Sequence, residues 1–451
     1  DLGIPMAEYD FKFPNQARVA FYAYLQKKKK DPDFNMKFAT TTFSQEFIHN
    51  TFRVNPICRE TIITDLDGDM YMKTFLQCFN RKWQEDDSDF WFKSTYAYGA
   101  GVIKAFSKYM PNFTFAHILD FFRYDYEEQI RCLMALDDPE INAKIEAVRK
   151  PIVEGKAADQ VSGIFSTLQN DIGPMHNRYM FFAISKSEAS LHMNDPNNPT
   201  QLIIGNNNKY KKIFGPVISL YYAIIFNLCN NINQLPLHVL IDEAATLNLM
   251  GVDEFINTGR SNGMITTLGF QGFSQSDFIY GDKLARVILT SLGNWYFGQI
   301  NDERAIETVV KTMGKYKTEI KNKSINKGGT GLSTNLQEEN FIRYEEVGEF
   351  DQGYFTGKMS EGEHKRFLGQ TDVSEFAPYM KNAEKQILPL GPSVHHLMLQ
   401  GDISKDDIRR YYNGHAASAT KINQAVDKYA DSEYKRIQNE TSLFLMGQPI
   451  S

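Results

Sequence analysis

Two adjacent carboxylates follow a short apolar segment near the middle of the chain. Residues 237–241 are largely apolar, and Asp242 and Glu243 come directly after them. Short apolar strands are typical of parallel sheets covered on both faces, and such sheets bind ligands at the carboxyl ends of their strands. In nucleotide hydrolysis, a carboxylate at this place anchors Mg²⁺ through water, and a second one orients and deprotonates the attacking water. A solvated Asp-Glu turn after a strand is the structural alternative.

Two further polar residues come shortly after this acidic pair. Arg260 lies in a glycine-flanked turn, 259–263, and Gln271 directly follows an expected strand at 264–270. An amide at the end of that strand could sense a γ-phosphate or hold the lytic water. The arginine could stabilise transition-state charge, on its own nucleotide or on that of a neighbouring subunit. We expect all four polar side chains to converge on one edge of the sheet; the alternative is that Arg260 and Gln271 only cap backbone groups.

This region resembles the type IV coupling proteins, the TraD and TraG class of hexameric, DNA-pumping, RecA-like ATPases. The segments that carry the resemblance are Ile241-Asp242-Glu243-Ala244-Ala245-Thr246-Leu247, the turn from Gly259 to Gly263, Gly269-Phe270-Gln271, Gln275 and Tyr280-Gly281. Weaker matches are Ala7-Glu8-Tyr9-Asp10-Phe11-Lys12, Arg53-Val54-Asn55-Pro56, Asp89-Phe90-Trp91 with Ala97, and Gly348-Glu349-Phe350 to Gly357. The resemblance covers roughly residues 4–360 and is most specific at 237–281.

The resemblance implies a role for each residue of the cluster. Asp242 would be the Walker B residue that binds Mg²⁺, and Glu243 would be the catalytic base. Arg260 and Gln271 match the arginine and the glutamine of the family's next motif. The implied cofactors are ATP and Mg²⁺.

The resemblance also implies partners and a cellular place. Asp10 and Lys12 end a strand that is expected near the same nucleotide-binding edge, without a definite role. The partners implied are single-stranded DNA, a relaxase within its relaxosome, and a type IV secretion channel. A membrane-anchored homo-hexamer at the cytoplasmic face of the inner membrane is the implied assembly.

The family's phosphate-binding loop does not occur in the sequence. No GxxxxGK[ST] segment is present, and Gly328-Gly329-Thr330-Gly331 lacks the lysine that reaches the phosphates. In the family this loop precedes the strand that opens the chain, so truncation is favoured over a degenerate member. Since the loop's amides and lysine hold the phosphates, we expect this chain alone to be inactive. We also expect the chain alone to be a monomer.

Two other functions stay open. The chain could be a non-hydrolysing module that recruits the relaxase or accessory proteins, or a related RecA-like DNA translocase. A GxxxxGK[ST] segment encoded upstream would favour the motor over the module. Trp91 and the expected helical insertion argue against the translocase.

Lysines are concentrated in one segment after the acidic cluster. Such a segment could follow nucleic-acid phosphates, with salt-sensitive and sequence-independent binding. A solvated loop is the alternative. The lysines are Lys311, Lys315, Lys317, Lys321, Lys323 and Lys327.

The surrounding elements predict an α/β fold: a RecA-like, mostly parallel sheet flanked by helices, with a large all-α domain inserted and an antiparallel hairpin at its edge. Apolar spacing of three and four residues predicts helices over about 70–180. Strands are expected at 4–13, 34–43, 179–184, 201–204, 237–241, 264–270 and 295–300, and the hairpin at 341–359. The expected domains are 1–68, the first part of the sheet domain; 69–178, the insertion; 179–390, the rest of the sheet domain; and 391–451, a C-terminal helical tail.

The length and composition of the chain limit its possible folds and partners. A length of 451 residues exceeds one compact core, and a formal charge of −6 means that any nucleic-acid contact needs a local basic surface. The 4 cysteines are scattered without a CxxC pair, which excludes a disulfide framework. Residues 213–241 carry no charge, but their apolar part, 214–228, is shorter than the roughly 20 residues that span a bilayer. We therefore expect a buried helix there.

Overall fold

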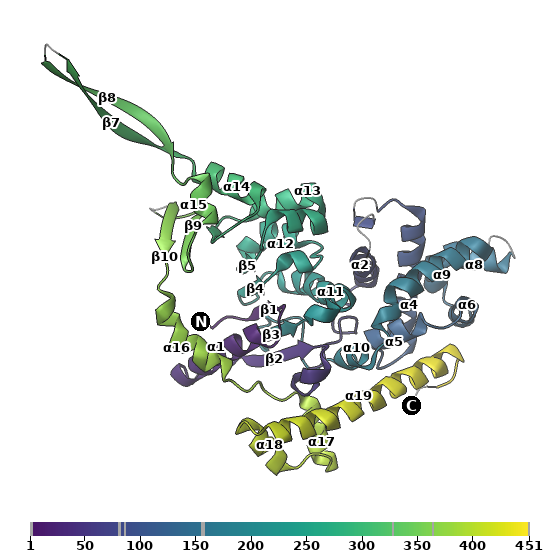
Figure 1. The fold of residues 1–451 in the computed structure, drawn as a ribbon. Coiled ribbons are helices and arrows are strands. Elements are labelled where there is room, and N and C mark those ends of the chain that lie inside the picture. Colours follow the sequence, from purple (N-terminus) through teal and green to yellow (C-terminus); the bar gives the residue numbers. More distant parts are fainter. Residues whose placement is uncertain are drawn as a thin grey trace. The chain divides into compact units, whose positions relative to one another are not determined.

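The computed structural model describes residues 3–79, 83–84, 87–154, 158–326, 329–362 and 365–449 (Figure 1). The chain divides into two compact units. The first comprises Asp1–Gly269 together with Asn382–Ser451, and the second comprises Phe270–Lys381. The first unit thus contains the parallel sheet, the helical insertion and the C-terminal helices.

A five-stranded parallel sheet forms the centre of the first unit, in the order β2-β3-β1-β4-β5. All four neighbouring pairs are parallel, so the carboxyl ends of the strands share one edge, which we call the carboxyl edge, and the other ends share the amino edge. Together with the flanking helices, this confirms the expected α/β fold. The strands are β1 (Met6–Asp10), β2 (Lys37–Thr42), β3 (Thr200–Gly205), β4 (Leu237–Ile241) and β5 (Met264–Leu268).

Helices follow the strands in the alternating pattern that a parallel sheet requires. They are α1 (Asn15–Lys30), α11 (Lys211–Cys229) and α12 (Val252–Gly259). By length and composition, one segment, Asn208–Cys229, could cross a membrane, but 78% of its apolar window is buried inside the fold. This burial confirms the expected core helix.

Between β2 and β3 the chain forms the expected helical insertion. Its core is aromatic: Phe75, Phe92, Phe106 and Phe121 are fully buried. The helices are α2 (Asp65–Gln77), α4 (Phe90–Tyr109), α5 (Phe115–Phe121), α6 (Tyr126–Ala135), α7 (Pro139–Lys144), α8 (Glu146–Val153), α9 (Ala158–Ile172) and α10 (Arg178–Ala183).

The strand expected at 179–184 is wrong, because α10 occupies these residues. A short apolar run fits a buried strand and a buried helix equally well. The local signal that decides is Asn177, whose side chain accepts a hydrogen bond from Met180 N and so caps the helix.

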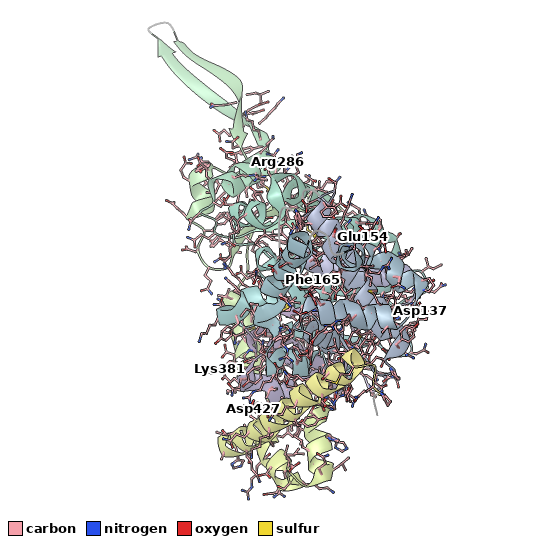
Figure 2. The ribbon with its side chains drawn as sticks, turned by 90° about the vertical axis from the view of Figure 1, so that its right-hand side faces the viewer. Asp137, Glu154, Phe165, Arg286, Lys381 and Asp427 are labelled. Atoms are coloured by element: carbon pink, nitrogen blue, oxygen red, sulfur yellow. The ribbon has the colours of Figure 1, made fainter. Side chains whose placement is uncertain are left out.

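The C-terminal segment folds against the rest of the first unit. It comprises three helices, α17 (Pro392–Gln400), α18 (Lys405–Tyr412) and α19 (Ala416–Leu445). Figure 2 shows α19 running across the unit, with Asp427 labelled on it. Near the sheet, His49 Nδ1 lies 2.7 Å from Asn423 Oδ1, and in the insertion the Phe106 and Phe444 rings are 4.4 Å apart. The helix α19 therefore joins the sheet to the insertion.

One buried arginine secures the same junction. Arg53 lies on the connection from the sheet into the insertion, and its side chain is 2% exposed. Its guanidinium pairs with Glu188, on the returning connection, at 2.6 Å, and with Glu433 of α19 at 3.1 Å. The guanidinium also lies over the rings of Phe182 and Tyr429. The Arg53 side chain therefore links the connection into the insertion, the returning connection and α19.

The second unit is built from helices and antiparallel strands. A three-stranded sheet has the order β10-β9-β6, and a long two-stranded hairpin, β7-β8, projects from the rest of this unit (Figure 1). The elements are α13 (Phe273–Ser291), β6 (Trp295–Phe297), α14 (Glu303–Met313), β7 (Lys315–Asn326), β8 (Gly329–Asn340), α15 (Tyr344–Gly348), β9 (Tyr354–Lys358) and β10 (Arg366–Gln370). A further helix, α16 (Val373–Glu384), leads out of the unit.

Two expectations for this unit are wrong. β6, expected to continue the parallel sheet, pairs antiparallel with β9 instead. The hairpin expected at 341–359 is formed by β9 and β10, because α15 occupies the first part of that range. Short apolar runs specify a strand but not its partner, which explains the first error.

We predict that Arg53→Met lowers the free energy of unfolding by about 3–5 kcal/mol, because it leaves the Glu188 carboxylate, which is 6% exposed, without the Arg53 cation, whereas Glu433 keeps its ion pair with Arg436. Urea unfolding followed by circular dichroism measures the change. The matched control is Lys435→Met on α19, since Lys435 is 72% exposed in its pair with Asp431. That change should cost less than about 0.5 kcal/mol. Equal small losses in both variants would contradict the structural role of Arg53.

Candidate active site

The acidic pair lies at the carboxyl edge of the sheet, as expected. Asp242 and Glu243 directly follow β4, which lies between β1 and β5. Backbone pairing continues past the end of the strands: Gly269 N donates to Ile241 O at 2.9 Å, and Ala244 N donates to Gly269 O at 2.8 Å. These two hydrogen bonds fix the backbone before and after the acidic pair to the end of β5.

Gly269 allows this close approach. A Cβ atom at position 269 would lie 3.2 Å from Asp242 Oδ1, closer than ordinary van der Waals contact. A larger residue would have to displace the carboxylate or the strand. The absence of a side chain thus leaves the Asp242 carboxylate in place at the edge.

The backbone of Glu243 has a conformation that non-glycine residues rarely adopt. Its φ is 55° and its ψ is 51°, in the left-handed region. Such residues cost on the order of 1–3 kcal/mol and concentrate at functional sites. Thr246 compensates, because both its backbone N and its Oγ1 donate to Glu243 O at 2.8 Å.

Two buried carboxyl groups of β1 share the neighbourhood of Asp242. Burial raises the pKa of Glu8 to about 8, and the charges of Asp10 and Asp242 add to the shift. Burial also raises the pKa of Asp10 to about 6, against the lowering effect of the backbone amides of Ala17, Lys12 and Gln16. Burial beside Asp10 and Asp242 therefore favours the protonated, uncharged form of Glu8 at neutral pH.

Asp10 also has a structural role. Its Oδ2 accepts a hydrogen bond from Ala17 N at 2.9 Å and so ties the end of β1 to the first turn of α1. Within the described part of the chain, its Oδ1 is buried without a hydrogen-bond partner. Lys12 lies in the turn between β1 and α1 and is exposed. Both residues are thus at the carboxyl edge, where they were expected.

Arg260 does not join the acidic pair, so the expectation that all four polar residues share one edge is wrong within a single chain. Arg260 precedes β5, in a short helical turn. Gly263, in the same turn, accepts a hydrogen bond from Leu237 N at the start of β4. Because β4 and β5 are parallel, Arg260 lies at the amino edge, and its side chain is exposed.

Gln271 belongs to the second unit, two residues beyond Gly269. Its side chain is exposed. Since β5 runs toward the carboxyl edge, the chain leaves the first unit at that edge. The expected role of Gln271 remains a prediction.

The residues present fit a Mg²⁺ ion that is bound together with a nucleotide. Within the described ranges, no group of three or more His, Cys, Asp or Glu side chains could hold a metal ion. Mg²⁺ in phosphate-processing sites keeps several waters and needs only one or two carboxylates besides the phosphates. Asp242, half-buried at the edge beside Gly269, meets that requirement.

The segment predicted to contain a basic loop is mostly a β-strand. Lys311 is exposed in the last turn of α14, and Lys315 and Lys317 are exposed at the start of β7. Lys321 and Lys323 also belong to β7. Position 317 is opposite Glu338, whereas 321 and 323 are opposite Thr334 and Leu332. Lys327 is outside the described residues.

Glu8 and Gly269 are parts of the site that were not expected from the sequence. A carboxylate within an otherwise apolar strand is a detectable signal for a buried titratable group. A glycine directly after a strand also marks a close backbone approach. Nothing in the residue type of Glu243 indicates its left-handed backbone conformation.

Comparison with known proteins gives a consistent result. Residues 236–352 match the family described as the TraM recognition site of TraD and TraG. The bacterial conjugative coupling protein TrwBΔN70, in an unbound crystal form, has a TM-score of 0.58 and 13% identity, with 82% of this chain and 85% of that chain covered. The plasmid coupling protein TrwB in complex with ADP and Mg²⁺ gives 0.56 and 13% over the same shares. No curated protein sequence matches the chain.

We predict that the stability of the protein falls between about pH 5 and pH 8 and that Glu8→Gln reduces this fall. The folded state retains a proton on Glu8 up to a pKa of about 8, whereas the unfolded chain releases it near 4.5. The advantage of the folded state is therefore complete below pH 4.5 and is lost as the pH rises toward 8, by on the order of 5 kcal/mol.

Urea unfolding at several pH values measures this effect. Glu254→Gln, which changes an exposed carboxylate on α12, is the control and should leave the profile unchanged. Identical profiles for the wild type and Glu8→Gln would show that Glu8 is ionised in the fold.

Proposed function

We infer that this chain is related to the type IV coupling proteins of conjugation, since its fold and its residues 236–352 both match them, and we propose that it is their cytoplasmic motor part. In the intact protein, ATP hydrolysis would drive the transfer of relaxase-bound single-stranded DNA into a type IV secretion channel. The observation that carries this proposal is the acidic pair at the carboxyl edge, with Glu243 held in a left-handed conformation.

In the proposed mechanism, Asp242 would hold Mg²⁺. The metal and the phosphates, when bound, supply the electrophilic centre and the charge neutralisation that phosphoryl transfer requires. Glu243 orients the attacking water and accepts its proton. Gln271, on the segment that continues from β5, would respond to the γ-phosphate.

The amino-edge position of Arg260 supports one of the two roles considered for it. β4 and β5 have five residues each and are paired in register. At about 3.3 Å per residue they separate the two edges by roughly 16 Å. Arg260 is therefore proposed to act on the nucleotide of a neighbouring subunit, which agrees with a ring-shaped homo-oligomer, a hexamer by resemblance.

The proposed partners follow from the resemblance and from charge. The matched family's name refers to recognition of TraM, which supports a partner from the relaxosome. The lysines of β7 are proposed to contact DNA phosphates, because the outer part of that strand has no acidic residue opposite Lys321 or Lys323. We also propose that the protein lies at the cytoplasmic face of the inner membrane.

A non-hydrolysing docking module is the second candidate. It is favoured by one observation: no GxxxxGK[ST] segment occurs in the 451 residues. In that case the fold would serve recruitment of the relaxase. The two candidates differ in whether a longer protein that includes this chain hydrolyses ATP.

We predict negligible ATPase activity for this chain alone, and activity once an upstream segment with a GxxxxGK[ST] loop is present. In that longer protein, Glu243→Gln should lower kcat by about 10²–10⁴-fold, because the amide cannot accept the proton of the water. A phosphate-release assay measures both. Unchanged hydrolysis in Glu243→Gln would refute its assignment as the base.

We also predict that replacing Lys315, Lys317 and Lys323 with glutamine weakens the binding of single-stranded DNA. Glutamine is chosen because a new acid opposite Glu338 would disturb the hairpin. The slope of log K against log salt should fall by about 2, for three lost phosphate contacts.

Fluorescence anisotropy at several salt concentrations measures this binding. The control replaces Lys28, Lys29 and Lys30 with glutamine. These residues form the exposed end of α1, so the control removes the same amount of positive charge from another part of the protein. Equal effects of the two triple variants would show non-specific attraction rather than a role for β7.

A further inference from the structure

A chain of hydrogen bonds runs beneath the acidic pair and ends on the backbone of Glu243. Asn206 Nδ2 lies 2.8 Å from the hydroxyl of Tyr9, and this hydroxyl lies 3.1 Å from Thr246 Oγ1. Thr246 Oγ1 in turn donates to Glu243 O at 2.8 Å. Three side chains from separate parts of the sequence are thus linked to one carbonyl group.

The chemistry of the groups fixes the direction of this chain. A carbonyl oxygen can only accept, so the hydroxyl hydrogen of Thr246 is used on Glu243 O. Thr246 Oγ1 must then accept from the hydroxyl of Tyr9. The oxygen of Tyr9 accepts in turn from the amide of Asn206. Each member therefore has one assigned rotamer and one assigned hydrogen direction.

The chain connects three neighbouring parts of the carboxyl edge. Tyr9 is in β1, Asn206 directly follows β3, and Thr246 ends the short turn after Glu243. Asn206 is fixed further by its own backbone, because its N donates to Asp10 O at 3.0 Å. The ends of β3 and β1 thus support the turn after β4.

The hydroxyl of Tyr9 remains a hydrogen-bond donor over the ordinary pH range. It is fully buried, and burial raises its pKa to about 12, with the charges of Asp10 and Glu243 adding to the effect. The phenol keeps its proton, so the hydrogen-bond direction does not change with pH.

The end point of the chain is the strained residue of the site. Glu243 has its left-handed conformation only while its surroundings hold it there. Its carbonyl accepts from both Thr246 N and Thr246 Oγ1, and Tyr9 holds the Oγ1 in place. Loosening this carbonyl would let the backbone relax and turn the carboxylate away.

We propose that Tyr9, together with Asn206 and Thr246, forms a set of positioning residues that keeps Glu243 in its productive orientation. This inference rests on the proposed role of Glu243 as the base. None of the three residues needs to touch the nucleotide or the attacking water. Their effect is on how often the base is correctly oriented, so it should appear in kcat and not in KM.

The decisive variant is Tyr9→Phe, in the longer protein that includes a phosphate-binding loop. We expect kcat to fall about 10-fold, because a misplaced catalytic group costs one to two orders of magnitude, and we expect KM for ATP to stay within about twofold. The matched control is Tyr221→Phe. Tyr221 is equally buried and donates its hydroxyl to Val54 O at 2.8 Å, so this change removes a comparable hydrogen bond from the same unit.

Both tyrosine variants should lose similar thermal stability, whereas only Tyr9→Phe should lose kcat. Hydrogen exchange provides a readout that does not depend on activity. The amides of Thr246 and Leu247, which are bonded within the turn, should exchange faster in Tyr9→Phe and not in Tyr221→Phe.

A second pair of variants covers the case in which Tyr9→Phe does not fold. Thr246→Ser keeps the hydroxyl and should retain most of kcat, whereas Thr246→Ala should reproduce the loss. Equal activity of the two would overturn the proposal.

The outcomes also separate this proposal from the proposed function. If Glu243→Gln abolishes hydrolysis while Tyr9→Phe retains the wild-type kcat, the positioning role is refuted and the motor function stands. If the longer wild-type protein has no ATPase activity at all, the proposed function fails, and the positioning proposal fails with it.

Discussion

The parallel pairing of β1, β4 and β5 is the constraint on which the site depends. In a parallel sheet every residue that follows a strand is carried to one edge, and every residue that precedes a strand is carried to the other. Asp10 ends its strand, Asp242 and Gly269 directly follow theirs, and the three residues therefore meet. Arg260 precedes its strand and is therefore separated from them. No side-chain interaction in the first unit could reverse this assignment.

Charge is buried in two different ways in the first unit. At the junction of the sheet and the insertion, Arg53 is buried with two carboxylates, so the charges are paired and support the fold. At the carboxyl edge, Glu8 and Asp10 are buried beside Asp242, and burial raises their pKa values. The first arrangement is complete within the protein. In the second, burial favours the protonated forms of the carboxyl groups, and raised pKa values of this kind are typical of functional sites.

Much of the first unit could be predicted from the sequence because its elements have strong patterns. β4 and β5 are short apolar segments, α11 is a long one, and the insertion has helical spacing throughout. The errors have local causes. α10 is an apolar run too short to show its period, and β7 has four lysines and only three apolar residues, Tyr316, Ile320 and Ile325, so its sequence does not alternate regularly between apolar and polar residues. Strand partners, such as β9 for β6, depend on contacts that the sequence does not specify.

The placement of Arg260 could have been predicted, and the reason bears on the assembly. A residue in the turn before a parallel strand must lie at the amino edge, and this follows from chain direction alone. An arginine at that edge cannot reach the nucleotide served by its own acidic pair. If Arg260 contributes to hydrolysis, each site then needs two chains, and a single copy with a complete phosphate-binding loop would still lack one cation. Hydrolysis and assembly would therefore be coupled by the topology of the sheet and not by any separate regulatory element.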